Sequence, residues 1–152
     1  MTGIHLTLKF FGEIEESQVD TLAAAASDIT CVTPAFTLNV QGVGTFPSLK
    51  SPRVIWLGLS GQTEILTHLV ENLEQVFAPL GFAPEKRHFT PHLTLGRVRS
   101  SQGREALSRF LQTVSLPDFP ELLVEQLVLF RSTLRPQGAL YTPLRQISLR
   151  GT

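Results

Sequence analysis

The sequence predicts an α+β fold built from antiparallel β-sheets with helices on their outer faces. Segments with alternating apolar residues and segments with helical apolar spacing follow one another as strand, helix, strands, helix, strand, helix, strands. The composition, with 42% hydrophobic and 17% charged residues in 152, is that of one domain with a substantial core. Neither a low-complexity stretch nor a long linker divides the chain, so we expect a single domain over residues 1–152.

The first half of the chain is predicted to contain three strands and two helices. Apolar residues alternate over Ile4–Phe11, and Gly12 ends this strand. Ser17–Thr30 is predicted as a helix with its first residue as N-cap, because apolar residues recur at helical spacing behind this serine. The next elements are a strand, a loop rich in glycine, proline and serine, a second strand and the most regular helix: Ala35–Val43, Gly44–Pro52, Arg53–Leu59 and Thr63–Phe77.

The second half is predicted to contain three further strands and one short helix. Pro79 and Gly81 end the preceding helix. The expected elements, in chain order, are a strand, a helix and two strands: Thr90–Arg99, Gly103–Leu111, Leu122–Arg131 and Tyr141–Arg150. A turn around Pro136–Gly138 separates the last two strands, so we expect them to pair as an antiparallel hairpin.

The formal net charge of zero conceals two halves of opposite sign. Residues 1–76 hold three basic and eight acidic residues, whereas residues 77–152 hold ten basic and five acidic ones. Ten of the thirteen basic residues are arginine, the side chain best suited to bidentate contacts with phosphate. The charge balance therefore excludes a broad basic surface for non-specific nucleic-acid binding, while a local arginine cluster in the second half can hold one phosphate-bearing end.

Cysteine content and hydropathy exclude other classes of protein. The single cysteine, Cys31, excludes an internal disulfide and every Cys-based zinc cluster. No apolar run approaches the ~18 residues that a transmembrane helix needs. His5 and Lys9 interrupt the apolar stretch at the N-terminus, which therefore lacks the pattern of a signal peptide. We expect a soluble protein of the cytoplasm.

A repeated tetrapeptide is the most informative feature of the sequence. His5-Leu-Thr-Leu8 recurs 87 residues later as His92-Leu-Thr-Leu95. Because side chains alternate between the two faces of a strand, each copy would place an imidazole and a hydroxyl on one face and two leucines on the other. An approximate two-fold relation between the halves would bring both His-Thr pairs to one groove.

Two such pairs suit the displacement of a phosphodiester. Two histidines that titrate near neutrality can serve as base and acid in one reaction. Two threonine hydroxyls can donate hydrogen bonds to the non-bridging oxygens of the phosphate. This chemistry does not require a metal. The alternative is that both histidines are ordinary half-buried residues of strands.

The chain resembles the 2H phosphoesterases, and among them the RNA 2′,3′-cyclic phosphodiesterases, also called 2′-5′ RNA ligases. The resemblance rests on five segments that follow in order along nearly the whole chain: His5-Leu-Thr-Leu-Lys-Phe-Phe-Gly-Glu13, Thr45-Phe-Pro47, Pro52-Arg-Val-Ile-Trp56, Pro91-His-Leu-Thr-Leu-Gly-Arg97 and Tyr141-Thr-Pro-Leu144.

The resemblance implies a bilobal fold with a pseudo-two-fold pair of antiparallel sheets around a central cleft. It also implies hydrolysis of RNA 2′,3′-cyclic phosphate ends to 2′-phosphates, in some members with reversible 2′-5′ ligation. Neither reaction would require a metal or a nucleotide cofactor. Members of the family usually begin with a further strand and helix, which this sequence lacks before His5. The expected ligands are RNA ends or small cyclic nucleotides.

The resemblance also suggests the roles of the motif residues. We expect His92 to activate water and His5 to protonate the leaving 3′ oxygen, although the near-symmetry of the motifs allows the reverse order. Thr7 and Thr94 would bind the phosphoryl oxygens. Arg97 would contact phosphate or base if Gly96 marks a bulge that turns it toward the face of His92; otherwise it is an exposed arginine on the far face.

Two aromatic residues are further candidates for substrate binding. Phe11 shares the predicted face of His5 and would stack on a base, with packing in the core as the alternative. Tyr141, the only tyrosine, lies in the segment that resembles the family's C-terminal motif, with a structural role in a terminal strand as the alternative.

Other functions remain open. Three imidazoles, those of His5, His88 and His92, could form a zinc site. The sequence has neither the H-E-x-x-H spacing nor a carboxylate near either motif on the same predicted face, so a zinc site is not favoured. A 2H enzyme of this kind can act on another phosphodiester, such as a 2′-5′ oligonucleotide or a cyclic ADP-ribose phosphate. A protein that binds RNA ends with little turnover is the alternative outside enzymes.

Overall fold

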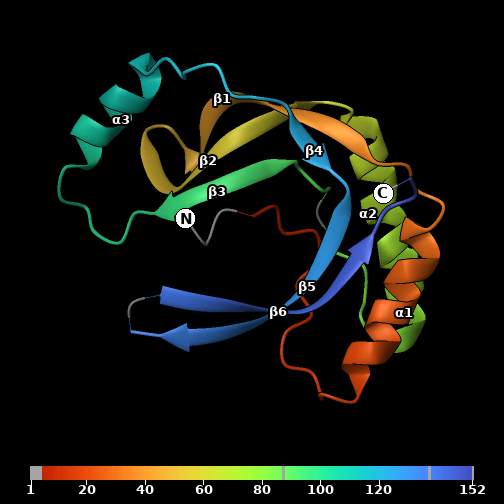
Figure 1. Cartoon of the computed structure of the whole chain (residues 1–152). Helices are drawn as coiled ribbons and strands as arrows, with labels where there is room; N and C mark the ends of the chain where they lie inside the picture. Colours follow the sequence, from red (N-terminus) through yellow and green to blue (C-terminus); the bar gives the residue numbers. More distant parts are fainter. Residues whose placement is uncertain (1–4, 87, 137, 152) are drawn as a thin grey trace. The chain divides into compact units, whose positions relative to one another are not determined.

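The computed structural model, drawn in Figure 1, describes residues 5–86, 88–136 and 138–151. The chain divides into two compact units. Unit 1 comprises the described residues up to Leu6, together with Thr37–Thr63 and Thr90–Leu122. Unit 2 comprises Thr7–Phe36, Glu64–Phe89 and the described residues from Leu123 onward. Each unit combines helix and strand, and its longer strands pair in antiparallel fashion, so the predicted α+β class is confirmed.

Unit 1 is built on a sheet whose strands follow the order β3-β2-β1-β4. The long strands β1 (Phe36–Ser48) and β2 (Ser51–Gly61) pair with each other, and β3 (His92–Arg97) pairs with β2 (Figure 1). The short strand β4 covers Leu122–Val124, of which only Leu122 belongs to unit 1. Helix α3 (Arg104–Thr113) is joined to the β1–β2 turn by Ser108, whose hydroxyl donates to the carbonyl oxygen of Leu49 over 2.6 Å.

The prediction of a loop over Gly44–Pro52 is wrong, because β1 continues through its first half. Gly44 lies opposite Trp56 in the register, and Ser48 lies opposite Ser51, which leaves a two-residue turn. The glycine that suggested a loop makes room for a ring instead: a Cβ atom added at Gly44 would lie 2.1 Å from Cζ2 of Trp56. A missing side chain here indicates a close approach between neighbouring strands rather than a turn.

Unit 2 pairs two helices with a two-stranded sheet. The helices are α1 (Gln18–Thr30) and α2 (Thr63–Phe77), and a short 3₁₀ helix, η1, follows at Ala78–Leu80. The strands β5 (Gln126–Arg135) and β6 (Gly138–Ser148) form the hairpin that was expected near the C-terminus.

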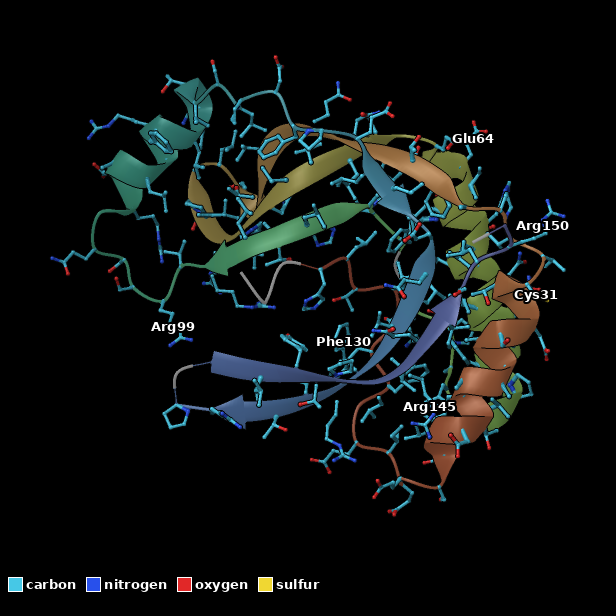
Figure 2. All side chains as sticks on the ribbon, in the orientation of Figure 1. Cys31, Glu64, Arg99, Phe130, Arg145 and Arg150 are labelled. Carbon is cyan, nitrogen blue, oxygen red and sulfur yellow. The ribbon has the colours of Figure 1, made fainter. Side chains whose placement is uncertain are left out.

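Helix α1 lies along the hairpin and is linked to β6 by charged side chains (Figure 1). Figure 2 shows Arg145 on the side of β6 toward α1, where its guanidinium donates to Asp20 Oδ1 over 2.6 and 3.0 Å. Both side chains of this pair are largely exposed, so it contributes little to stability.

The buried apolar residues of the described chain are unevenly shared between the two units. Unit 1 contributes Leu38, Leu57, Leu111 and the fully buried Pro52. Unit 2 contributes the larger set, dominated by the inward stripes of α1 and α2: Val19, Leu22, Ala26, Phe36, Leu66, Leu69, Val70, Leu73, Phe77 and Leu149. The helix predicted at Thr63–Phe77 therefore has an apolar stripe that faces the core.

Two other predictions of elements need correction. The described part of the strand expected at Ile4–Phe11 is not a strand, because alternation sets the faces of a segment without supplying a neighbour to pair with. The strand expected at Leu122–Arg131 is divided between β4 and β5 at Glu125. Ser17 is the N-cap of α1, as predicted, but its side chain makes no capping hydrogen bond.

Candidate active site

The second His-x-Thr motif lies on one face of β3, the strand next to β2 in Figure 1. His92 is opposite Gly58 and Thr94 is opposite Trp56 in the antiparallel register. Residues that are opposite in a ladder share a face, and alternate residues of one strand do so too. The imidazole and the hydroxyl therefore stand side by side on the face of Trp56, as the alternation predicted.

A bulge in β3 brings Arg97 to the same face. Thr94 pairs with Trp56 but Gly96 pairs with Ile55, so Leu95 is an extra residue between them. The next pair, Val54 with Arg97, is again on the face of Trp56. The predicted bulge is confirmed, and it places an exposed guanidinium on the face of His92 and Thr94.

The orientation of the His92 ring follows from one hydrogen bond. Nδ1 lies 2.6 Å from the carbonyl oxygen of Thr90, two residues earlier. A carbonyl oxygen only accepts, so Nδ1 carries the proton that it shares, and in the neutral ring Nε2 holds the free lone pair. This bond fixes the tautomer and leaves Nε2 as the nitrogen that can exchange a proton with a ligand.

Two aromatic residues that were not predicted as site residues, Phe46 and Trp56, lie beside His92. The ring centroid of Phe46 lies 5.4 Å from that of His92 and that of Trp56 lies 6.0 Å away, both in edge arrangements. Phe46 and Trp56 also contact each other at 5.3 Å, and Phe46 remains 40% exposed. Edge contacts of this kind hold an imidazole in place, and the exposed ring leaves an apolar surface beside it.

The first motif is divided between the two units. His5 and Leu6 are half-buried and belong to unit 1, as does His92, whereas Thr7 is exposed and belongs to unit 2. Both histidines of the repeat are therefore in one compact unit.

The remaining candidates lie in unit 2. Phe11 packs edge-on against Phe77 and Phe82, with ring centroids 4.9 and 5.0 Å away, so the packing alternative describes its observed contacts. Tyr141 is on β6, with its ring 6.1 Å from that of Phe130 and 39% of its surface exposed. The roles of both residues in substrate binding stay predictions.

Among residues 5–86, 88–136 and 138–151, no group of three or more His, Cys, Asp and Glu side chains is arranged to hold a metal ion. None of the helices in this part of the chain is long and apolar enough to cross a membrane.

The chain is similar to one family model and to several proteins that share one name. The family model described as "2′-5′ RNA ligase superfamily" matches residues 3–135. A protein of Methanothermobacter thermautotrophicus named RNA 2′,3′-cyclic phosphodiesterase is 32% identical over 147 residues, which cover 97% of this chain and 79% of the relative. A protein of the same name from Archaeoglobus fulgidus is 34% identical over 143 residues, which cover 94% and 78%.

Solved structures agree with these sequence matches. The structure of TT0787 of Thermus thermophilus matches with a TM-score of 0.76 at 29% identity, over 97% of this chain and 79% of that one. The structure of E. coli LigT complexed with 3′-AMP matches with a TM-score of 0.72 at 30% identity, over 96% of this chain and 76% of that one.

Proposed function

The chain belongs to the 2′-5′ RNA ligase superfamily, and from this premise we propose that it is an RNA 2′,3′-cyclic phosphodiesterase. The observation that carries this function is the agreement between the relatives and the motif. The proteins named for that activity match at about a third identity over nearly the whole chain. The expected family is thereby confirmed, and the enzyme class follows from it.

The proposed reaction opens the cyclic phosphate by water. His92 removes a proton from the attacking water through Nε2, while the water oxygen bonds to phosphorus. The bond from phosphorus to the 3′ oxygen breaks, and His5 donates a proton to that oxygen, which leaves a 2′-phosphate and a 3′-hydroxyl. The hydrogen bond from Nδ1 of His92 to Thr90 supports the role of its ring, because it holds Nε2 unprotonated in the neutral form. Exchanged roles for the histidines give the same products, and ligation requires the reverse transfers.

The non-bridging oxygens of the phosphate need hydrogen-bond donors, and each motif offers one threonine hydroxyl. We assign Thr94 and Thr7 to these oxygens, with Arg97 as a further contact to phosphate or base. The common face of His92, Thr94 and Arg97 supports this assignment. In this scheme no metal or nucleotide cofactor takes part, and substrates are RNA ends or small cyclic nucleotides. We also propose a cytoplasmic location, which the single, unbridged Cys31 supports.

The test is an assay with a short oligoribonucleotide that ends in a 2′,3′-cyclic phosphate, in the presence of a strong chelator. We expect turnover to a 2′-phosphate product at the rate measured without chelator. Loss of turnover in chelator, with recovery on adding a divalent cation, would contradict the metal-independent scheme. Tight binding without turnover would instead identify an RNA-end binding protein, and turnover only of a 2′-5′ oligonucleotide or cyclic ADP-ribose phosphate would reassign the substrate.

A further inference from the structure

A part-buried ion pair joins the segment that follows the first motif to helix α2. Lys9 Nζ lies 2.6 Å from Glu74 Oε2 and 2.7 Å from the carbonyl oxygen of Ala83. The side chains of Lys9 and Glu74 are only 7% and 14% exposed. These contacts link Lys9 to residues 65 and 74 positions further along the chain.

This pair holds a segment that has no strand of its own. The described residues His5–Phe11 lie outside any strand, so a backbone ladder does not fix their position. Lys9 instead links the segment to α2 through Glu74 and to the loop after it through Ala83. Phe11, two residues later, packs edge-on against Phe77 and Phe82. Thr7, two residues before Lys9, is exposed and belongs to the same unit.

Apolar side chains would hold this segment without the desolvation cost of burying two charges. Two charges removed from water often stabilise a fold no more than well-packed apolar residues of similar volume. A buried ammonium has one property that an apolar side chain lacks, because its donors fix both the position and the direction of the chain that carries it. Lys9 satisfies two of its three donors here, one to a carboxylate on a helix and one to a backbone carbonyl in the turn.

We propose that the cluster of Lys9, Glu74 and the Ala83 carbonyl is a positioning device that holds Thr7 where it can donate to the phosphoryl group. Lys9 is a positioning residue in this scheme, because it acts through Thr7. The inference rests on the proposed function for the role of Thr7. The position of the first motif would then be determined by residues that lie outside it.

The experiment compares the double variant Lys9→Met/Glu74→Met with the wild type, with Thr7→Val and with the combination of all three changes. The double variant removes both charges together, so that no buried charge is left unpaired and the fold is retained. We expect its melting temperature to stay near that of the wild type while kcat for the cyclic phosphate falls about tenfold, within the reach of a small misplacement of a reacting group. In the Thr7→Val background the same two changes should lower kcat by less than about twofold, because residues that act as a unit are not additive.

An exposed ion pair in the same unit provides the matched control. The variant Arg145→Gln/Asp20→Asn removes a pair that also joins a helix to a distant segment, and it should leave kcat and KM unchanged. Native kcat in Lys9→Met/Glu74→Met would overturn the positioning role. A tenfold loss that persists in full in the Thr7→Val background would overturn it too, because the cluster would then act independently of Thr7.

A binding measurement separates this inference from the proposed function. Inorganic phosphate titrated into each variant reports on Thr7 without any turnover, and we expect the cluster variant to bind it several-fold more weakly than the wild type does. If the wild type fails to turn over the cyclic phosphate, the proposed function fails, while the phosphate titration still tests the positioning role. Equal phosphate affinity in both proteins would then contradict the inference.

Discussion

The two His-Leu-Thr-Leu segments have the same sequence but are held by different interactions. The second copy lies in β3, where ladder bonds to β2 fix its face and a bulge adds Arg97 to that face. The first copy lies outside any strand, and the residues that follow it are held by a part-buried ion pair and by the edge contacts of Phe11. The same four residues therefore do not determine how they are held in the fold. Each copy depends on residues outside the motif for its position.

The largest expected effect tests whether the two copies are chemically equivalent. Replacing either His5 or His92 by alanine should lower kcat about 10²- to 10⁴-fold, because each ring transfers a proton in the same step. The pH profile of the wild type should be bell-shaped, and each variant should lose the dependence on one limb. Near-full activity in either variant would exclude a mechanism with two histidines.

A smaller effect tests whether the two hydroxyls are equivalent. Thr7→Val and Thr94→Val each remove one hydrogen bond to a charged oxygen, worth about 1.5–3 kcal/mol, so kcat should fall about 10- to 100-fold in both. Thr113→Val, on the exposed end of α3, is the control and should leave kcat unchanged. A loss confined to Thr94→Val would show that the first copy contributes only its histidine.

The support of the second copy can be disturbed by itself. Gly44→Ala places a Cβ atom against the ring of Trp56, which must shift, and such overpacking costs about 1–3 kcal/mol of unfolding free energy. Because Trp56 contacts His92, kcat should also fall. Chemical denaturation gives the stability change, and Gly96→Ala is its control, since an added Cβ meets nothing within 4 Å there. Unchanged stability in Gly44→Ala would mean that the ring is free to move aside.

The smallest effect concerns Arg97, the residue that only the second copy has. It is exposed, so its attraction for a phosphate group is worth about 0.2–1 kcal/mol, and Arg97→Met should raise KM by up to about fivefold at low salt. Added salt should reduce the difference from the wild type. Arg109→Met, on α3, should leave KM unchanged, and an equal rise there would indicate a general effect of charge instead.

The sequence predicted best what depends on local periodicity. Helix α2 begins and ends at the predicted residues, because its apolar stripe and the proline and glycine after it are local signals. The face shared by His92, Thr94 and Arg97 was also predictable, since alternation and a single glycine suffice to suggest it. Here too the information lies within six residues of one strand.

What the sequence did not predict depends on pairing between distant segments. Phe46 and Trp56 reach His92 because three strands are in register, and the register cannot be derived from one strand alone. The loop expected at Gly44–Pro52 has the same cause, because its glycine is explained by a ring on the neighbouring strand. The ion pair of Lys9 could not be derived from the sequence either, since its partner Glu74 is 65 positions away.

The uneven division of buried apolar residues has a consequence for how the molecule loosens before it unfolds. In the described chain, ten such residues support unit 2, but only Leu38, Leu57, Leu111 and Pro52 support unit 1, which carries both histidines of the repeat. Regions with few buried contacts open at a lower free energy than the best-packed helices of the same protein. The backbone amides of β3 should therefore exchange with solvent before those of α2, and on heating, catalytic competence should fade before the helical signal does.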